Sequence, residues 1–392
     1  MSHRLLPAAL AAIALLLAPG AATAKRVPSG PAGAAFYTTP KPLGGKRHGD
    51  LLRARRLTGA AALPGARRTD LLLYRGTGVD GKPVAISGAL SIPKGKAPRG
   101  GWPVISYAHG TTGLADQCAP TRDGSSPLTA YVYPTLTSWL KRGWAVVRTD
   151  YEGLGTAGVH PYLVGTSEGR AVLDVVRAAR QRDRRLSTRR VILAGHSQGG
   201  HAALWAAALA PSYTRDLRVK GTVAFAPASH TGKQGALISA LKDPSGLTGL
   251  AASILAGVEV QRPALDVAGK LTDRARALYP QVATRCLPDL LGTSSFGGLA
   301  PADLLRPDAD LAPVLKALNE NDPETLKIKT PLRVEQGLMD TTVFPSFTKD
   351  LVTALRGRKA TIDFVERDGV DHGAIVIDGA KASTSWIAKR LR

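Results

Sequence analysis

The chain has 392 residues, and its 44% hydrophobic content is ordinary for a globular protein with a sizeable core. Its formal net charge of +22 raises nucleic acid, anionic lipid and cell-wall polymer as candidate partners. The basic residues are spread along the whole chain, however, and we find no helix-turn-helix, zinc finger or aromatic-basic platform. We therefore expect a solubilising surface charge, no nucleic-acid partner, and at most weak adsorption to an anionic surface.

Residues 1–24 have the three parts of a secretory signal peptide. Arg4 supplies the positive charge, residues 5–18 form the apolar stretch, and Ala22-Thr23-Ala24 is a small-residue cleavage site. Because the apolar stretch is short and ends at Pro19-Gly20, we predict cleavage near Ala24 and secretion rather than a membrane anchor. No later run has the length that a membrane span needs, so we expect no transmembrane segment in the mature chain.

Export would place the two cysteines, Cys118 and Cys286, in an oxidising compartment. An even pair in an oxidising compartment favours a disulfide. Such a bond would close a long loop and contribute on the order of 4 kcal/mol if unstrained. Two cysteines alone cannot form a tetrahedral zinc site, and no spaced His/Cys cluster completes one. We expect neither a metal site nor a cofactor.

The secondary-structure pattern changes from an irregular arm to a regular alternation. Residues 25–63 are rich in Pro, Gly and basic residues, and we interpret them as an extended, partly ordered arm. Strands are predicted at residues 69–74, 84–92, 102–107, 144–150, 191–194, 219–226, 332–336 and 361–366. Helices are predicted at residues 129–141, 167–182, 201–210, 345–355 and 373–391. With a hairpin turn at residues 79–82, this alternation predicts an α/β fold with a parallel, doubly wound sheet preceded by an antiparallel hairpin.

The alternation stops between residues 230 and 330. This segment is rich in Ala and Leu, has Pro and Gly breaks, and shows little strand pattern. Short helices are predicted at residues 236–241, 247–258, 264–279, 301–305 and 311–318. We interpret the segment as an inserted helical cap, which assigns residues 64–229 and 331–392 to the core. The alternative is that these helices simply extend the helical layer over the sheet.

The sequence Gly195-His196-Ser197-Gln198-Gly199 has the Gly-x-Ser-x-Gly spacing of a nucleophile elbow. It lies between a predicted buried strand and a predicted helix, as an elbow requires. The serine of an elbow has a strained backbone, so glycines are needed where strand and helix converge. The N–H groups at the start of the helix point to where negative charge develops. We predict that Ser197 is the nucleophile and that His196 points away from its hydroxyl.

A second match to this spacing, Gly165-Thr166-Ser167-Glu168-Gly169, has a different context. Pro161 precedes it and argues against a central strand. Ser167 opens an amphipathic helical run, so we interpret it as a helix N-cap with Glu168 in the first turn.

A serine hydroxyl needs a base, and that base needs an orienting acid. In parallel sheets, reactive groups collect just past the C-terminal ends of strands, and Asp340 and His372 each follow a predicted strand. The order Ser, Asp, His is that of α/β-hydrolases, so we predict Asp340 as the acid and His372 as the base. Asp371 competes as the acid, although adjacent side chains diverge, and Asp150 at the end of an earlier strand is the next competitor.

The oxyanion formed when a serine attacks a carbonyl group needs two backbone N–H donors. Gln198, directly after the nucleophile, should supply one. The other should come from the loop His109-Gly110-Thr111-Thr112, which follows the strand predicted at residues 102–107. The sequence leaves the choice between Thr111 and Thr112 open.

Taken together, these motifs resemble the secretory lipase family, a group of α/β-hydrolases found in fungi and actinobacteria. The resemblance runs from about Phe36 onward. It is carried by Asp340, His372 and the segments at residues 36–40, 106–113, 118–120, 150–153 and 195–199. The chain departs from the fungal pattern at Gln198, at His109-Gly110 and in having one cysteine pair.

The resemblance implies an α/β-hydrolase fold with a helical cap over the site. It also implies a disulfide from the oxyanion loop to the cap, matching Cys118 with Cys286. Hydrolysis of acylglycerols or simpler esters is implied too, with Ser197, Asp340 and His372 as nucleophile, acid and base.

We therefore predict a secreted serine ester hydrolase, a lipase or an esterase, that acts through an acyl-enzyme intermediate. Its partners would be a lipid or small ester substrate and, by adsorption, a lipid–water interface. The apolar run at residues 250–258 would either shield an acyl pocket and move at a lipid surface or be ordinary cap core. A secreted serine peptidase and a non-catalytic binding protein of the same fold are the alternatives.

Overall fold

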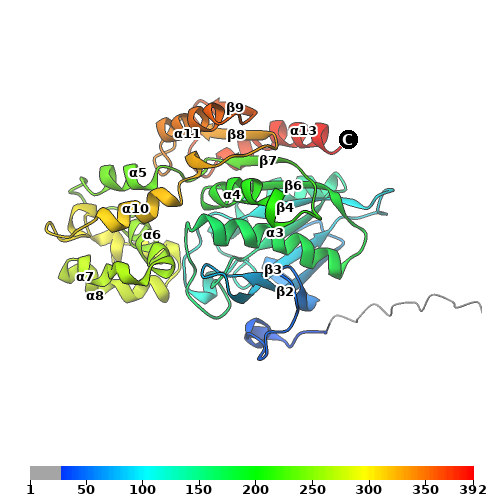
Figure 1. The fold of residues 1–392 in the computed structure, drawn as a ribbon, viewed down its shortest axis with the longest axis horizontal. Coiled ribbons are helices and arrows are strands. Elements are labelled where there is room, and N and C mark those ends of the chain that lie inside the picture. Colours follow the sequence, from blue (N-terminus) through cyan, green and yellow to red (C-terminus); the bar gives the residue numbers. More distant parts are fainter. Residues whose placement is uncertain (1–27) are drawn as a thin grey trace, which may run out of the picture.

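The structure is a computed structural model that describes residues 28–392, so the predicted signal peptide at residues 1–24 lies outside the described residues. The strands of this part of the chain form a nine-stranded sheet in the order β1-β2-β3-β5-β4-β6-β7-β8-β9 (Figure 1). Their bounds are β1 Leu51–Arg56, β2 Arg68–Thr77, β3 Pro83–Ile92, β4 Trp102–Ala108, β5 Ala145–Thr149, β6 Leu186–His196, β7 Val219–Phe225, β8 Leu332–Gly337 and β9 Ile362–Arg367. The sheet is antiparallel from β1 through β3 to β5 and parallel from β5 to β9. The predicted fold class is therefore confirmed.

Helices cover both faces of the sheet. Those outside the segment between β7 and β8 are α1 Pro127–Ala130, α2 Tyr133–Lys141, α3 Gly165–Arg182, α4 Gln198–Tyr213, α11 Pro345–Gly357, α12 Ile375–Asp378 and α13 Ala380–Arg390. Helices α3, α4 and α11 pack on one face, and α2, α12 and α13 pack on the other. Successive residues of a strand point to opposite faces of the sheet. Val104 of β4 therefore packs on the face covered by α3, α4 and α11, and Ile105 packs on the other face. Strands buried on both faces read as continuous apolar runs, which is why they were predictable.

The chain between β7 and β8, residues 226–331, is called the insertion here. Its helices are α5 Thr231–Ile238, α6 Leu247–Gln261, α7 Val267–Lys270, α8 Asp273–Leu278, α9 Leu287–Leu290 and α10 Ala312–Glu320. They pack around an apolar cluster of their own and form a lobe beside the sheet, on the left of Figure 1. The single helix predicted at residues 264–279 is wrong. Leu271 is extended and pairs with Leu305, so the run divides into α7 and α8.

The N-terminal arm contains a strand that the sequence did not reveal. Strand β1 lies at the edge of the sheet and pairs with β2, and only Ala54 of its six residues is buried. Its sequence, Leu-Leu-Arg-Ala-Arg-Arg, lacks the apolar alternation of a half-buried strand. The backbone groups of β2 offer hydrogen bonds along that edge, and these stabilise the strand where side-chain burial does not.

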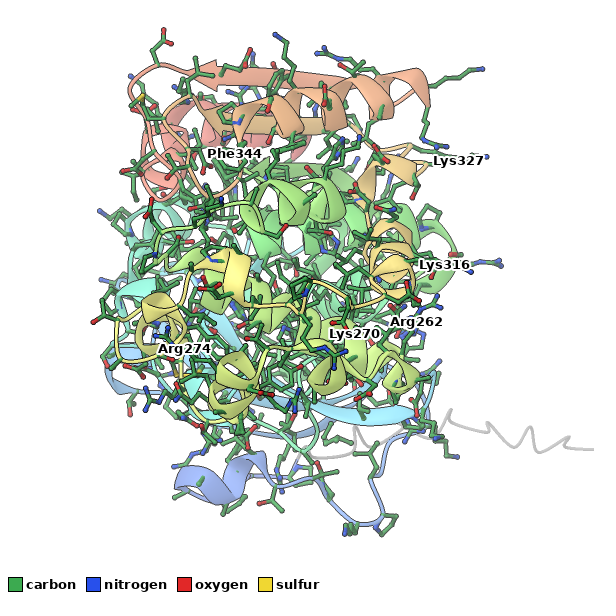
Figure 2. All side chains as sticks on the ribbon, turned by 90° about the vertical axis from the view of Figure 1, so that its left-hand side faces the viewer. Arg262, Lys270, Arg274, Lys316, Lys327 and Phe344 are labelled. Carbon is green, nitrogen blue, oxygen red and sulfur yellow. A yellow bond between two sulfur atoms is a disulfide. The ribbon has the colours of Figure 1, made fainter. Side chains whose placement is uncertain are left out.

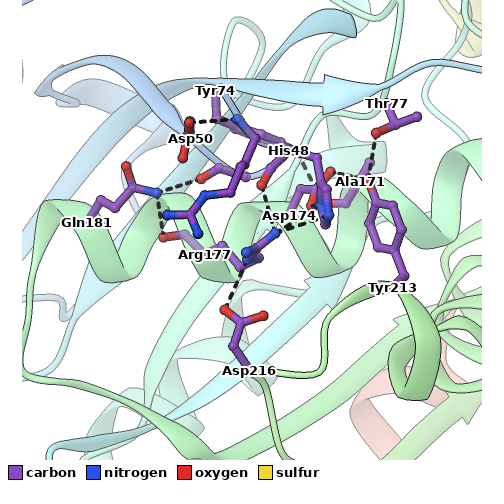
Figure 3. A network of polar contacts seen from close by, with 12 residues as sticks. His48, Asp50, Tyr74, Thr77, Ala171, Asp174, Arg177, Gln181, Tyr213 and Asp216 are labelled. Carbon is purple, nitrogen blue, oxygen red and sulfur yellow. Dashed lines mark hydrogen bonds and ion pairs between the residues drawn. The ribbon is translucent and has the colours of Figure 1, made fainter. Parts of the chain in front are cut away.

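The chain before β1 is held to α3 by polar contacts (Figure 3). Nδ1 of His48 lies 2.6 Å from the buried carboxylate of Asp174, whose other oxygen accepts from the hydroxyl of Tyr213 at 2.8 Å. Arg177 donates to the carbonyl oxygen of His48 at 2.8 Å, and Gln181 donates to that of Gly49 at 2.8 Å. The arm is therefore ordered where it meets the core.

Basic side chains on the insertion side project from several elements rather than from one stripe. Figure 2 labels five of them: Arg262, Lys270, Arg274, Lys316 and Lys327. Among residues 28–392, no helix is both long enough and apolar enough to cross a bilayer.

Candidate active site

Ser197 lies at the tip of the turn between β6 and α4, with φ at 56° and ψ at −119°. This positive φ is strained for a residue with a side chain. A Cβ atom on Gly195 would overlap the carbonyl oxygen of Gly199, and one on Gly199 would overlap that of Ala108. The two glycines are required because the strand, the turn and the neighbouring strand β4 approach too closely for any side chain.

Asp340 and His372 meet beyond the ends of β8 and β9. Nδ1 of His372 lies 2.7 Å from Oδ2 of Asp340. The carboxylate is buried, and its Oδ1 accepts from the backbone N–H groups of Thr342 and Val343, each at 2.8 Å. Gln336 donates to Oδ2 at 3.1 Å. These donors fix the carboxylate in place.

The two competing acids are engaged elsewhere. Asp371 accepts from the backbone N–H of Ala374 at 2.8 Å. Asp150 is fully buried and accepts from Ser87 at 2.6 Å and from Thr121. Of these three carboxylates, the structure places Asp340 against the ring of His372.

Ser197 and His372 line one cavity of about 700 Å³. Apolar side chains of the insertion and of α12 form much of its wall, among them Leu247, Leu250, Leu287, Leu291 and Ile377. The residues far apart in the chain thus converge on one apolar chamber at the C-terminal edge of the sheet.

The structure separates the two candidate donors of the oxyanion loop. Thr111 lines the cavity, and its hydroxyl hydrogen-bonds to that of Tyr162 at 2.6 Å. Thr112 is buried, and its carbonyl oxygen accepts from the backbone N–H of Leu287 in the insertion at 2.9 Å. Gln198 is the first residue of α4, where backbone N–H groups have no partner within the helix. Thr111 thus shares a cavity with Ser197, and Gln198 follows the serine directly in the chain.

A disulfide joins Cys118 to Cys286, with their Cα atoms 5.4 Å apart. The predicted disulfide is confirmed. Beside it, Gly113 forms an isolated β-bridge with Cys286. The oxyanion loop and the insertion are thus connected by a covalent bond and by backbone hydrogen bonds.

His196 takes a position that the sequence did not indicate. Its Nε2 donates to the carbonyl oxygen of His372 at 2.8 Å, and its Nδ1 contacts the hydroxyl of Tyr131. Burial, with a further contribution from His372, holds the pKa of His196 well below its usual value, so the ring stays neutral. Its nitrogens support the loop of His372 and are not directed to the serine. These contacts span 65 and 176 residues of sequence and leave no local pattern.

The second Gly-x-Ser-x-Gly match opens α3, but its serine is not the N-cap. Helix α3 begins at Gly165 after Val164, and the hydroxyl of Ser167 donates to Glu152. Glu168 lies in the first turn as predicted, and its carboxylate accepts from the backbone N–H of Leu163 at 2.9 Å. The N-cap prediction was wrong because the helix begins two residues before Ser167, with Val164 at the N-cap position.

One group of potential metal ligands occurs in the described residues: His230, Asp322 and Glu324. Nδ1 of His230 lies 3.7 Å from Asp322, whereas Nε2 lies 3.3 Å from Glu324. One ligand atom from each of the three residues lies within 4.8 Å of the other two.

Comparisons with known proteins identify the family and the fold. The family model described as secretory lipase matches residues 126–392. Lipase A of Moesziomyces aphidis is 29% identical over 305 residues, which cover 74% of this chain and 63% of that protein. The probable inactive lipase MT1628 of Mycobacterium tuberculosis is 29% identical over 262 residues, covering 63% of this chain and 56% of that protein. The chain thus spans less than two thirds of the length of these two relatives.

Solved structures share the fold. Candida antarctica lipase A in its closed state superposes with a TM-score of 0.78 at 23% identity, covering 91% of this chain and 85% of that one. The rice cell wall degrading esterase LipA from Xanthomonas oryzae superposes with a TM-score of 0.69 at 22% identity, covering 87% of this chain and 97% of that one. The chain has the α/β-hydrolase fold and belongs to the secretory lipase family.

Proposed function

We propose that this protein is a secreted serine ester hydrolase that cleaves acylglycerols or simpler carboxylic esters. The observation that carries the proposal is the meeting of Ser197 and the Asp340–His372 pair at one apolar cavity. A strained serine beside a histidine that a buried carboxylate orients is the arrangement needed to activate a hydroxyl group.

In the proposed reaction, His372 takes the hydroxyl proton of Ser197 as the serine oxygen attacks the ester carbonyl. Asp340 accepts from Nδ1–H of the ring, which leaves Nε2 free to act as the base. The backbone N–H groups of Gln198 and Thr111 hold the oxyanion of the tetrahedral intermediate.

Collapse of that intermediate breaks the ester bond, and His372 delivers its proton to the departing alcohol. A water molecule then attacks the acyl-enzyme, with the same histidine as base, and releases the carboxylic acid.

The insertion supplies much of the apolar wall that an acyl chain would contact. We assign residues 230–330 to a cap over the site. Within the predicted apolar run, Leu250 lines the cavity. Ala252, Leu255 and Val258 instead pack in the insertion's own core. This division favours a structural role for most of the run, with its first turn serving the acyl group.

Secretion is part of the proposal. The family is described as secretory, and a relative in Malassezia globosa at 25% identity is named a secreted triacylglycerol lipase. We assign residues 1–24 to a signal peptide cleaved near Ala24, with adsorption to a lipid–water interface after export.

A non-catalytic protein of the same fold is the second candidate, since one relative is named a probable inactive lipase. Reaction with a fluorophosphonate probe distinguishes the hydrolase from the non-catalytic protein, because a protein without an activated serine does not react. A chromogenic peptide, compared with a short-chain nitrophenyl ester, tests the peptidase alternative.

The Ser197→Ala variant tests the proposal itself. Removing the nucleophile should lower kcat for a nitrophenyl ester by about 10⁴-fold or more, with the fold intact by circular dichroism. A folded variant that keeps most of the wild-type turnover would refute the assignment. Wild-type turnover across acyl lengths, from acetate esters to emulsified triglycerides, then distinguishes an esterase from a lipase.

A further inference from the structure

A buried network of polar side chains lies beneath the nucleophile elbow, and the reaction described above makes no use of these side chains. Its side chains are those of His160, Glu168, Gln198 and His201, exposed by 1%, 0%, 2% and 1%. They come from the loop before α3, from α3 and from the first turn of α4. Burying this many polar groups is costly unless every one of them is paired.

The side chain of Gln198 uses both of its amide hydrogens in this network. Nε2 donates to Nε2 of His160 at 2.8 Å and to Oε1 of Glu168 at 2.8 Å. Nδ1 of His160 lies 2.9 Å from the carbonyl oxygen of Glu152, so Nδ1 carries the ring hydrogen and Nε2 is the acceptor. Burial lowers the pKa of His160, which keeps the ring in this neutral form.

Glu168 connects Gln198 to the insertion. Its Oε2 lies 2.9 Å from Nδ1 of His201, and Nε2 of His201 donates to the carbonyl oxygen of Asn321 at 2.8 Å. Its Oε1 also accepts from the backbone N–H of Leu163 at 2.9 Å. The chain of hydrogen bonds thus runs without a break from the end of the insertion to the residue after the nucleophile.

The network also reaches the loop that carries the other proposed oxyanion donor. The ring of Tyr151 stacks on that of His160, with centroids 5.4 Å apart and planes 7° apart. The Tyr151 hydroxyl donates to the carbonyl oxygen of His109 at 2.9 Å, two residues before Thr111. One ring, that of His160, therefore contacts groups that hold both donors.

The second Gly-x-Ser-x-Gly match explains how Glu168 reaches α4. A Cβ atom on Gly165 would overlap the ring of Trp205, and one on Gly169 would lie 2.8 Å from the backbone nitrogen of Ala206. The glycines let α3 and α4 approach closely, which brings the carboxylate beneath the elbow.

We propose that His160 and Glu168 are positioning residues that hold the N–H groups of Gln198 and Thr111 toward the oxyanion. The inference rests on the proposed function. A misplacement of about 1 Å in a catalytic group costs about 10²-fold in rate, and loss of one oxyanion donor costs about 10²–10³-fold. A side chain that fixes the first turn of α4 therefore acts on the transition state more than on substrate binding.

Three variants test the hydrogen bonds. His160→Phe keeps an aromatic ring against Tyr151 but removes the acceptor for Gln198. Glu168→Ala removes the carboxylate. Glu168→Gln is the conservative variant: its amide oxygen can accept from Leu163 and Gln198, and its NH₂ can donate to Nδ1 of His201.

Ser91→Ala is the matched control. Ser91 is buried and hydrogen-bonded to Thr69 at 3.1 Å in the β2–β3 hairpin, away from the cavity. It reports the effect of losing a buried hydrogen bond as such.

The measurements are kcat and KM for a soluble nitrophenyl ester, and Kd for a trifluoromethyl ketone that forms a tetrahedral adduct with the serine. We expect His160→Phe and Glu168→Ala to lower kcat by about 10–100-fold, with KM within about threefold of wild type. Kd for the ketone should rise by the same factor as kcat falls. Glu168→Gln and Ser91→Ala should stay within about threefold of wild type in kcat.

Either of two results would overturn the inference: folded His160→Phe with wild-type kcat, or folded Glu168→Gln as slow as Glu168→Ala. Circular dichroism and Tm identify variants that fail to fold, and His160→Phe then carries the test if Glu168→Ala does not fold. Failure of the proposed function is distinguishable, because wild type would then neither hydrolyse the ester nor react with a fluorophosphonate.

Discussion

The carboxylate of Asp340 is held by four donors: two backbone N–H groups, the amide of Gln336 and the ring of His372. Asp150 and Asp371 carry the same carboxyl group, and their hydrogen-bond partners distinguish them from Asp340. Asp371 is adjacent in sequence to the histidine, yet it accepts from its own loop backbone.

Asp340→Asn tests the assignment of the acid. The amide would present an N–H₂ group or a weaker acceptor to Nδ1 of His372, which favours the wrong tautomer of the ring. We expect kcat to fall by about 10³–10⁴-fold with KM little changed. Asp371→Asn is the matched control and should remain within a few fold of wild type. Equal losses in the two variants would contradict the assignment.

The burial of His109 predicts how the free energy of unfolding depends on pH. The ring is buried, and burial lowers its pKa to about 4. In the unfolded chain His109 binds a proton near pH 6.5, whereas in the folded chain it does not. The contribution of His109 to the free energy of unfolding is therefore complete above pH 6.5 and falls as the solution is acidified. Between pH 7 and pH 4 the loss amounts to about 3 kcal/mol.

His109→Gln isolates this contribution, because every other titrating group is shared by the two proteins. The free energy of unfolding of wild type relative to the variant, measured with urea, should decline by about 3 kcal/mol from pH 7 to pH 4. A difference that stays constant with pH would show that the ring titrates normally in the folded protein.

At the scale of elements, the oxyanion loop depends on the insertion for its position. The disulfide between Cys118 and Cys286 and the hydrogen bond from Leu287 to Thr112 link them directly. The loop therefore carries a backbone conformation that its own residues do not determine.

Loss of the disulfide should affect both stability and turnover. For Cys118→Ser/Cys286→Ser we expect the free energy of unfolding to fall by about 2–5 kcal/mol. We also expect kcat to fall by about tenfold, since the loop gains freedom. Dithiothreitol should reproduce the kcat loss in wild type and have no effect on the double variant. A reduced wild type with unchanged kcat would show that the backbone contacts suffice.

In two elements, contacts with neighbouring segments determine the secondary structure against the local sequence pattern. Strand β1 forms although five of its six residues are not fully buried, because the edge of β2 is available. The helix predicted at residues 264–279 is broken because Leu271 pairs with Leu305. Both outcomes depend on contacts with segments distant in sequence.

At the scale of the whole molecule, we expect the net charge of +22 to affect adsorption to charged surfaces rather than the chemical reaction. We expect weak binding to vesicles that contain anionic lipid, and this binding should be lost at about 0.5 M salt because exposed charges are then screened. Cosedimentation with anionic and with phosphatidylcholine vesicles, at low and high salt, measures this. Binding that is the same at low and high salt and with both kinds of vesicle would indicate an apolar contact instead.

The sequence determined the features that act over a few residues. Strand–helix alternation, the glycines around Ser197 and the positions of Asp340 and His372 after strands follow from local periodicity and from backbone sterics. The fold was predictable on that basis and the family from the resemblance of its motifs, and both are confirmed.

Only the tertiary structure decided which side chains meet. It placed Thr111 rather than Thr112 on the cavity wall, directed His196 to Tyr131, and gathered Glu168, His160 and Gln198 beneath the elbow. Each of these contacts joins residues 30 or more positions apart in the chain or depends on such a contact. Hydrogen bonds of that kind are selected by packing, and packing leaves no short-range pattern in the sequence.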